Sequence, residues 1–172
     1  MGDLIVRPAR AGEEDVVLDV LAAAARWVRT ASVDQWPERF PTQLIEQGIE
    51  RGEVFLAIED GVVVGTLTLQ WSDPRFWKDS DDDAGYVHRL ALVPTDRERG
   101  LGHRLLSWAD EQVVTAGRRL LRLDCLAESS SLGAYYRAAG FEHQGDVDGG
   151  YSDTRSEGEG TSWTVSLYQR RV

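Results

Sequence analysis

The chain has 172 residues and a formal charge of −10, from 29 acidic residues against 19 Lys and Arg. A chain of this length folds by default around one core, and a content of 42% hydrophobic and 28% charged residues is typical of a globular protein. The negative charge argues against general binding to nucleic acids or anionic membranes, because both repel a negative surface.

Cysteine usage and hydropathy set further limits. Cys125 is the only cysteine, so the sequence excludes an intrachain disulfide and a thiolate metal cluster, and we expect no metal and a cytoplasmic location. We expect neither a signal peptide nor a membrane span, since no basic segment precedes an apolar one at the N-terminus. The longest apolar run, Val20 to Ala25, is far too short to cross a bilayer.

Hydrophobic periodicity and turn signals predict a mixed α/β chain without linker or repeat. In the first half we expect a strand at 4–6, helices at 12–28 and 42–51, a hairpin of 54–58 and 62–69 around Asp60-Gly61, a polar loop at 72–85, and a strand at 86–93. In the second half we expect a helix at 100–117, a strand at 120–126, a helix at 132–139, and strands at 141–147 and 161–168, the last reached across the acid-rich segment 148–160.

The segment 90–104 runs from a strand through a tight loop into a helix. Gly100 and Gly102 allow close backbone approach, and a helix N-terminus presents N–H groups and partial positive charge, which together predict an anion site. The alternative is that the glycines serve only close packing. Residues 86–122 hold seven arginines against four acids, a balance of +3, which favours a phosphorylated cofactor; the arginines are residues 89, 97, 99, 104, 118, 119 and 122. Walker and dinucleotide motifs are absent.

The run Arg97-Glu98-Arg99-Gly100-Leu101-Gly102 resembles the phosphate-loop signature of the GNAT superfamily of acyl-CoA N-acyltransferases, and Tyr135 to Phe141 resembles that family's Tyr-x-x-x-Gly-Phe ending. The resemblance implies one α/β domain over residues 1–172, with a mixed, mostly antiparallel sheet that is flanked by helices and whose fourth and fifth strands splay apart. It also implies acetyl-CoA as the cosubstrate and an amine as the acceptor.

The resemblance further implies which residues contact CoA. Backbone N–H groups of the loop would hold the pyrophosphate, and the strand edge before it would pair with pantetheine. Ser129 stands where the family often has an Asn that helps to hold pantetheine. The implied contacts are Leu90, Ala91, Leu92, Arg97, Glu98, Arg99, Gly100, Leu101, Gly102, His103, Arg104 and Ser129.

Acetyl transfer from a thioester to an amine needs a neutral amine, a stabilised oxyanion and often a proton for the departing thiolate. Tyr136 matches the family's general acid, and a phenol with a pKa of about 10 is protonated at neutral pH. The alternative for Tyr136 is packing on an amphipathic helix. We expect its neighbour Tyr135 to belong to the core, since adjacent helical side chains point in different directions.

Two residues are candidates for the base that accepts the amine proton. His88 lies on the strand before the phosphate loop and has an ordinary pKa of about 6.5. Asp124 lies in an otherwise apolar strand, at a position where some family members carry a catalytic Glu. A satisfied strand histidine and a structural ion pair are the alternatives, and the sequence leaves the choice open.

The acceptor site is predicted from aromatic residues in or beside loops. Trp36 and Trp71, with Tyr86, are the predicted substrate contacts, through apolar walls and cation–π contact, and Trp77 is a further candidate. Capping of the core is the alternative for the tryptophans. Two acid-rich loops would flank the entrance and favour a small cationic amine. Their acids are Asp79, Asp81, Asp82 and Asp83 in one loop, and Asp146, Asp148, Asp153, Glu157 and Glu159 in the other.

The leading hypothesis is therefore an N-acetyltransferase that works by direct transfer in a ternary complex. A catalytically silent CoA-binding regulatory or scaffold module of the same fold is the alternative. Cys125 adjoins Asp124, but a single thiol in an apolar strand is more often inert packing than a nucleophile. The last strand could pair across a homodimer.

Overall fold

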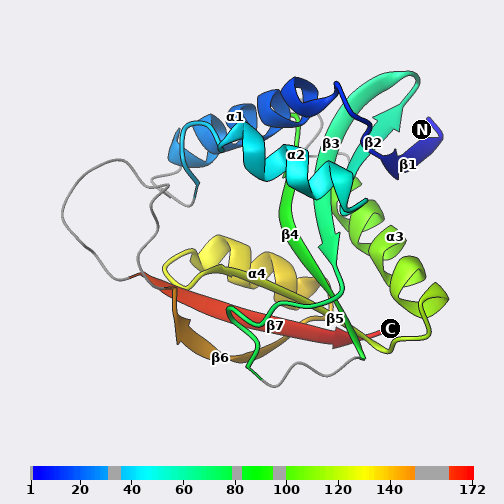
Figure 1. Ribbon diagram of the computed structural model, residues 1–172. Coiled ribbons are helices and arrows are strands. Elements are labelled where there is room, and N and C mark those ends of the chain that lie inside the picture. Colours follow the sequence, from blue (N-terminus) through cyan, green and yellow to red (C-terminus); the bar gives the residue numbers. More distant parts are fainter. Residues whose placement is uncertain (1, 31–35, 79–82, 95–99, 150–162) are drawn as a thin grey trace. The chain divides into compact units, whose positions relative to one another are not determined.

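The structure is a computed structural model (Figure 1). It describes residues 2–30, 36–78, 83–94, 100–149 and 163–172. Residues cluster into two compact units: unit 1 comprises Met1–Leu69 and His88–Trp108, and unit 2 comprises Gln70–Val87 and Ala109–Val172. Strand β4 (Ala84–Leu92) and helix α3 (Leu101–Thr115) contribute residues to both. Among the described residues, no helix is long and apolar enough to cross a membrane.

Unit 1 contains strands β1 (Leu4–Pro8), β2 (Val54–Glu59) and β3 (Val62–Gln70), with helices α1 (Glu14–Thr30) and α2 (Thr42–Glu50). The last residue of β3, Gln70, is assigned to unit 2. β2 is antiparallel to β1 and to β3. The turn between β2 and β3 has positive φ at both Asp60 and Gly61, as the predicted Asp-Gly hairpin requires.

The core of unit 1 lies where α1 and α2 pack against these strands. Its buried members are Ala9, Val17, Leu18, Val20, Leu21, Ala24, Ile45, Val54, Leu56 and Ala91. The acids Glu14 and Asp15 stand in the first turn of α1, where they complement the helix dipole. The apolar residues of α1 recur at helical spacing, which is why one face of this helix is buried.

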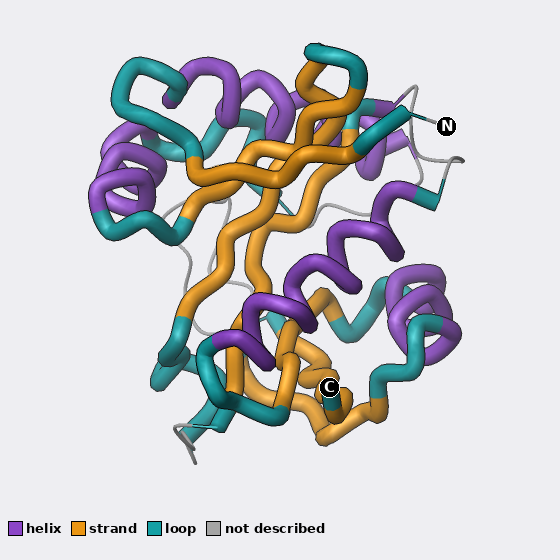
Figure 2. Tube along the Cα trace, turned by 90° about the vertical axis from the view of Figure 1, so that its right-hand side faces the viewer, coloured by secondary structure: helices purple, strands orange, loops and turns teal. Residues whose placement is uncertain are grey.

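Unit 2 contains the first part of β4, strands β5 (Leu120–Leu126), β6 (Glu142–Asp148) and β7 (Thr164–Arg171), and helix α4 (Ser130–Ala138). β7 lies between β5 and β6 and is antiparallel to both. Figure 2 colours the strands of the chain orange and the helices purple. β4 is parallel to β5. A second core packs here, with buried residues Phe76, Trp77, Ala84, Tyr86, Val165 and Leu167.

The hydrogen-bonded strand order over the described residues is β1-β2-β3-β4-β5-β7-β6. The predicted α/β class, with its mixed and mostly antiparallel sheet and flanking helices, is confirmed. Most predicted boundaries differ by one to three residues, and two of these differences have a clear cause in strand pairing. β4 begins at Ala84 instead of residue 86, because Ala84 and Gly85 pair with Leu120 and Leu121. β7 ends at Arg171 instead of residue 168, because its last residues continue the ladder with β5.

Candidate active site

The predicted anion site lies at the start of α3 in unit 1. Gly100 has φ +70°, a left-handed conformation that a side chain would strain, so glycine is favoured there. An α-helix leaves its first N–H groups outside its hydrogen-bond ladder, and Arg104 N donates to Gly100 O over 3.2 Å as the ladder begins. Leu101 and Gly102 are buried, whereas His103 is exposed. The predicted contacts Arg97, Glu98 and Arg99 lie outside the described residues.

Arg104 has both its backbone N–H and its side chain engaged within unit 1. Its Nη1 lies 3.0 Å from Glu59 Oε1, and its Nη2 donates to Gly2 O over 3.3 Å. Arg104 is one of the seven arginines between residues 86 and 122 whose charge favours a phosphorylated cofactor. The structure adds that Glu59 balances this charge.

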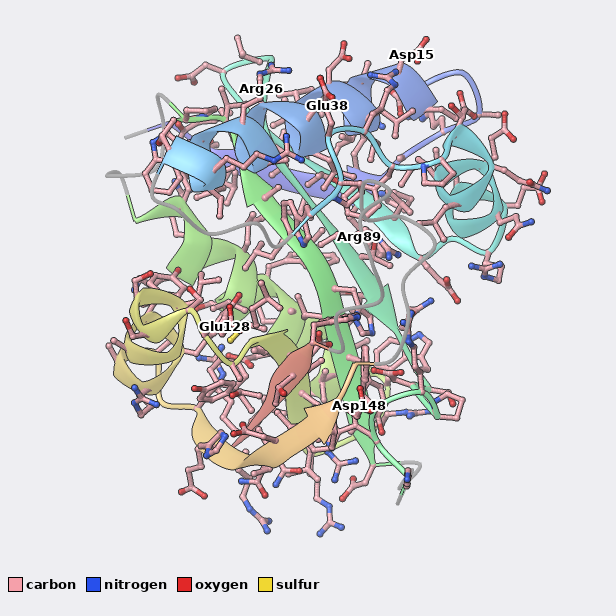
Figure 3. The ribbon with its side chains drawn as sticks, turned by 90° about the vertical axis from the view of Figure 1, so that its left-hand side faces the viewer. Asp15, Arg26, Glu38, Arg89, Glu128 and Asp148 are labelled. Carbon is pink, nitrogen blue, oxygen red and sulfur yellow. The ribbon has the colours of Figure 1, made fainter. Side chains whose placement is uncertain are left out.

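The second part of β4 carries the predicted pantetheine edge. Ala91 is buried, and Leu90 and Leu92 are half-buried. Arg89, labelled on β4 in Figure 3, has φ +48°, which interrupts the regular extended backbone just before these residues. On β3, a Cβ at Gly65 would come within 2.8 Å of Ala91 O and 2.9 Å of Leu92 Cδ2. Gly65 therefore lets β3 pack against this part of β4, on the side away from β5, more closely than any other residue type would.

Within unit 2, the pairing of β4 with β5 ends early. The register joins Ala84–Val87 to Leu120–Leu123, although β5 continues to Leu126. The remaining residues of β5, from Asp124, are paired on their other side with β7. An end of pairing at this point is what a splay of the fourth and fifth strands requires.

Tyr136 lies on α4 with its ring in an aromatic cluster of unit 2. The centroid of its ring is 5.4 Å from that of Tyr135, 5.9 Å from that of Phe141 and 5.9 Å from that of Tyr168. Tyr136 is 9% exposed, and burial is the main cause that raises its pKa, with Cys125 adding to the shift. The phenol is therefore protonated at neutral pH and can donate a proton. Tyr135, predicted to be core, is the less buried of the two.

The two candidate bases belong to different units of the structure. His88 lies on β4 at the boundary of unit 1 and is half-buried, and Asp124 lies on β5 in unit 2 and is also half-buried. Cys125, next to Asp124, is buried, and desolvation raises the pKa of its thiol to about 12. Such a thiol carries almost no thiolate at neutral pH, which favours the packing alternative.

Ser129 is the N-cap of α4. Its Oγ accepts a hydrogen bond from Leu132 N over 3.4 Å, and the residue is 4% exposed. A serine cap accepts a hydrogen bond from one of the N–H groups that have no acceptor within the first turn of a helix. Ser129 therefore fixes the first turn of the helix that carries Tyr136, and its predicted contact with pantetheine stays a prediction.

Among the predicted acceptor contacts in unit 2, Tyr86 is 1% exposed, and its hydroxyl accepts a hydrogen bond from Arg122 Nη1 over 3.1 Å. Trp71 is 38% exposed, but the guanidinium of Arg118 already lies 5.1 Å from its ring centroid. Trp77, predicted beside a loop, is 8% exposed and belongs to the core. Trp36, in unit 1, is partly buried against the core and contacts Phe40 edge-on.

Two described acids of the predicted entrance already have partners within unit 2. Asp83 pairs with Arg119 at 2.6 Å, which lowers its pKa. Asp146 accepts from Ser166 over 2.6 Å and lies 2.8 Å from His143 Nε2, and these contacts lower its pKa. Asp148, labelled in Figure 3, ends β6, and the next residue, Gly149, accepts a hydrogen bond at its carbonyl oxygen from Arg75 Nη2 over 3.1 Å. Asp79, Asp81, Asp82, Asp153, Glu157 and Glu159 lie outside the described residues.

Sequence reasoning missed Gly65 and Glu59. An isolated glycine inside a strand is a signal of close backbone approach, so Gly65 could have been found. Glu59 gave no such signal, because a carboxylate before an Asp-Gly turn is ordinarily solvated, whereas this one is 3% exposed.

The chain is similar to known acetyltransferases. The model of the acetyltransferase (GNAT) family matches residues 21–141. The uncharacterized N-acetyltransferase YesJ of Bacillus subtilis is 30% identical over 152 residues, covering 84% of each chain. An S-alkylcysteine N-acetyltransferase of the same organism is 26% identical over 151 residues, covering 83% of this chain and 80% of the relative.

Solved structures share the fold. A GNAT-family acetyltransferase from Listeria monocytogenes has a TM-score of 0.77 at 24% identity, covering 98% of this chain and 95% of that chain. The structure of yncA from Salmonella typhimurium, solved with its cofactor acetyl-CoA, has a TM-score of 0.67 at 17% identity, covering 98% and 94%. The chain belongs to the GNAT acetyltransferase family and is an N-acetyltransferase of that type.

Proposed function

We propose that the protein transfers the acetyl group of acetyl-CoA to the amine of a small cationic acceptor, by direct transfer in a ternary complex. The observation that carries this proposal is the start of α3, where a left-handed Gly100 precedes the N–H groups of a helix within the family's phosphate-loop motif. The family match supports acetyl-CoA as the donor, and the relative named for S-alkylcysteine supports a small amine as the acceptor.

The described residues fit acetyl-CoA. Helix N–H groups favour phosphate oxygens. The residues Leu90, Ala91 and Leu92 of β4 lie beyond the point where its pairing with β5 ends, which supports an edge that can pair with an extended amide chain. Acetyl-CoA supplies the thioester carbonyl that the acceptor nitrogen attacks. A backbone N–H of this edge would stabilise the oxygen on which negative charge develops.

Tyr136 would supply the proton for the departing thiolate. Its hydroxyl keeps its proton at neutral pH, as an ordinary phenol does, and burial, which raises the phenol pKa, also makes it a weaker acid than a free phenol. A thiolate with an ordinary pKa near 8.5 is a stable leaving group, so this proton assists the reaction without being essential.

His88 or Asp124 would take the proton of the acceptor amine, whose pKa is about 10 in water. The two are separable by the pH dependence of kcat/KM. If His88 is the base, His88→Gln removes the acidic limb of the profile and Asp124→Asn leaves it in place. The opposite pattern assigns the base to Asp124.

The experiment that tests the proposal follows the release of free thiol from acetyl-CoA with a mixed amine library. Thiol release that requires an amine supports the transferase. Tight CoA binding without thiol release for any amine would instead favour the CoA-binding module.

The cationic acceptor is tested separately. If the acidic residues attract the acceptor, cationic amines react faster than neutral ones, and this advantage shrinks as ionic strength rises. Equal rates with no response to salt would contradict the cationic acceptor and leave the transferase itself intact.

A further inference from the structure

An ion pair within unit 1 joins the first turn of α3 to the end of β2. Arg104 Nη1 lies 3.0 Å from Glu59 Oε1, and the side chains are 32% and 2% exposed. A buried carboxylate is costly without a hydrogen-bonded cation, so this pair belongs to the packing of unit 1. The second guanidinium nitrogen donates to Gly2 O over 3.3 Å, which fixes the guanidinium in a second direction.

Arg104 is also where the hydrogen-bond ladder of α3 begins, since its N–H donates to Gly100 O. The residue thus joins the predicted phosphate loop to the rest of unit 1 through both its backbone and its side chain. A rotation of the first turn would have to break the ion pair with Glu59. The direction in which the preceding N–H groups point therefore depends on this pair.

We propose that Glu59 and Arg104 are positioning residues, which hold the first turn of α3 so that the N–H groups before Arg104 bind the phosphates of CoA. The inference rests on the proposed function, because the phosphates are those of acetyl-CoA. It assigns to Glu59 a part in donor recognition, although its own negative charge would repel a phosphate.

A positioning role and a direct contact between Arg104 and a phosphate predict opposite effects of Glu59→Gln on the affinity for CoA. If Arg104 attracted the phosphate by its charge, Glu59→Gln would release the guanidinium and CoA would bind more tightly. If the pair positions the helix, Glu59→Gln loosens the first turn and CoA binds more weakly. Gln keeps the shape and a hydrogen-bond acceptor, so the substitution tests the charge pair with little change in volume.

The test is a protein-observed NMR titration with CoA and with pantetheine, which lacks the phosphates. We expect Glu59→Gln and Arg104→Gln each to raise the Kd for CoA about tenfold, the size of a helix-terminus interaction in a partly buried setting. Pantetheine affinity stays unchanged. Arg104→Lys, which keeps the charge pair, restores most of the CoA affinity. If a variant is partly unfolded, the apparent affinities for CoA and for pantetheine fall by the same factor. The ratio of these two affinities, measured on one sample, therefore reports the binding site and not the fraction of folded protein.

The matched control is Glu53→Gln. Glu53 forms a 3.0 Å ion pair with Arg51, whose side chain is 51% exposed, in the turn between α2 and β2. This variant should bind CoA as the wild type does. Unchanged or tighter CoA binding by Glu59→Gln, or an equal loss for CoA and pantetheine, overturns the positioning role. A wild type that does not bind CoA contradicts the proposed function itself, which separates the two failures.

Discussion

The guanidinium of Arg122 lies over the ring of Trp77, with 4.5 Å between its Cζ and the ring centroid. The same group donates to Tyr86 Oη over 3.1 Å and to Gln169 Oε1 over 2.7 Å. Arg122 is 7% exposed. This arginine is therefore a buried cation of unit 2 that joins β4, β5 and β7. From the sequence alone, it is one of the charges expected near a phosphate site.

Arg122→Lys should lower the free energy of unfolding by about 1–3 kcal/mol, because an ammonium cannot keep both hydrogen bonds and the stacking contact. Urea unfolding followed by tryptophan fluorescence measures the loss. Arg171→Lys, at an exposed position of β7, is the matched control and should leave stability unchanged. Equal stability of Arg122→Lys and the wild type would show that the stack contributes nothing.

Tyr136→Phe should lower kcat about tenfold to hundredfold and change the KM for acetyl-CoA little, because the hydroxyl acts on the leaving thiolate in the transition state. The aromatic contacts of the ring with Tyr168 and Phe141 remain, so the fold should persist. Steady-state thiol release measures both constants.

Tyr135→Phe is the control for this experiment, since it removes a hydroxyl from the adjacent position of the same helix. Full kcat in Tyr136→Phe, or an equal loss in both variants, would contradict the role of Tyr136 as general acid.

Cys125→Ala should retain kcat, because direct transfer needs no acetylated cysteine. Burial raises the pKa of the thiol to about 12, so alkylation at neutral pH should be slow in the folded protein and fast after unfolding. Mass spectrometry of the wild type mixed with acetyl-CoA should find no acetyl group on the protein. An inactive Cys125→Ala variant that remains folded, or an acetylated Cys125, would point to a covalent intermediate.

Glu13 should contribute to stability in a pH-dependent way. Its two carboxylate oxygens accept from Arg7 over 2.8 and 2.7 Å, and this contact is the main cause that lowers its pKa from 4.5 to about 2. A carboxyl with a lowered pKa stabilises the fold above its unfolded pKa, and this stabilisation is lost as the pH falls through the folded pKa.

We expect Glu13→Gln to cost about 1 kcal/mol at neutral pH, a modest value because both side chains are about a quarter exposed. The difference from the wild type should shrink below pH 4.5 and vanish near pH 2. Urea unfolding across this range measures it. A difference that does not vary with pH would exclude the Arg7–Glu13 pair as its cause.

The order of elements could be predicted from the sequence because local signals mark it. Asp60-Gly61 indicates a hairpin, and Gly100 indicates the start of α3, since each needs a backbone conformation that glycine or a short polar residue adopts. The starting point of β4 could not be predicted. Ala84 and Gly85 become strand residues only through their pairing with β5, which is distant in the sequence.

The local structure at the candidate site was predictable where neighbouring residues determine it and not where packing decides. The helix start at Gly100, on which the predicted anion site rests, follows from residues that are adjacent in the chain. The arginine count near it did not reveal that Arg104 pairs with Glu59, that Arg118 donates to the carbonyl oxygens of Trp71 and Ala84, or that Arg119 pairs with Asp83. These partners come from distant segments, so composition alone assigns such charges to a ligand too readily.

The central claim is tested most directly by following labelled acetyl-CoA to its product. The protein is mixed with acetyl-CoA that carries an isotope in the acetyl group and with a library of small amines, and the amines are analysed by mass spectrometry. We predict labelled acetyl on the nitrogen of at least one amine, with one free thiol released for each group transferred. CoA that binds to the protein while no amine in the library acquires the label would contradict the proposed function.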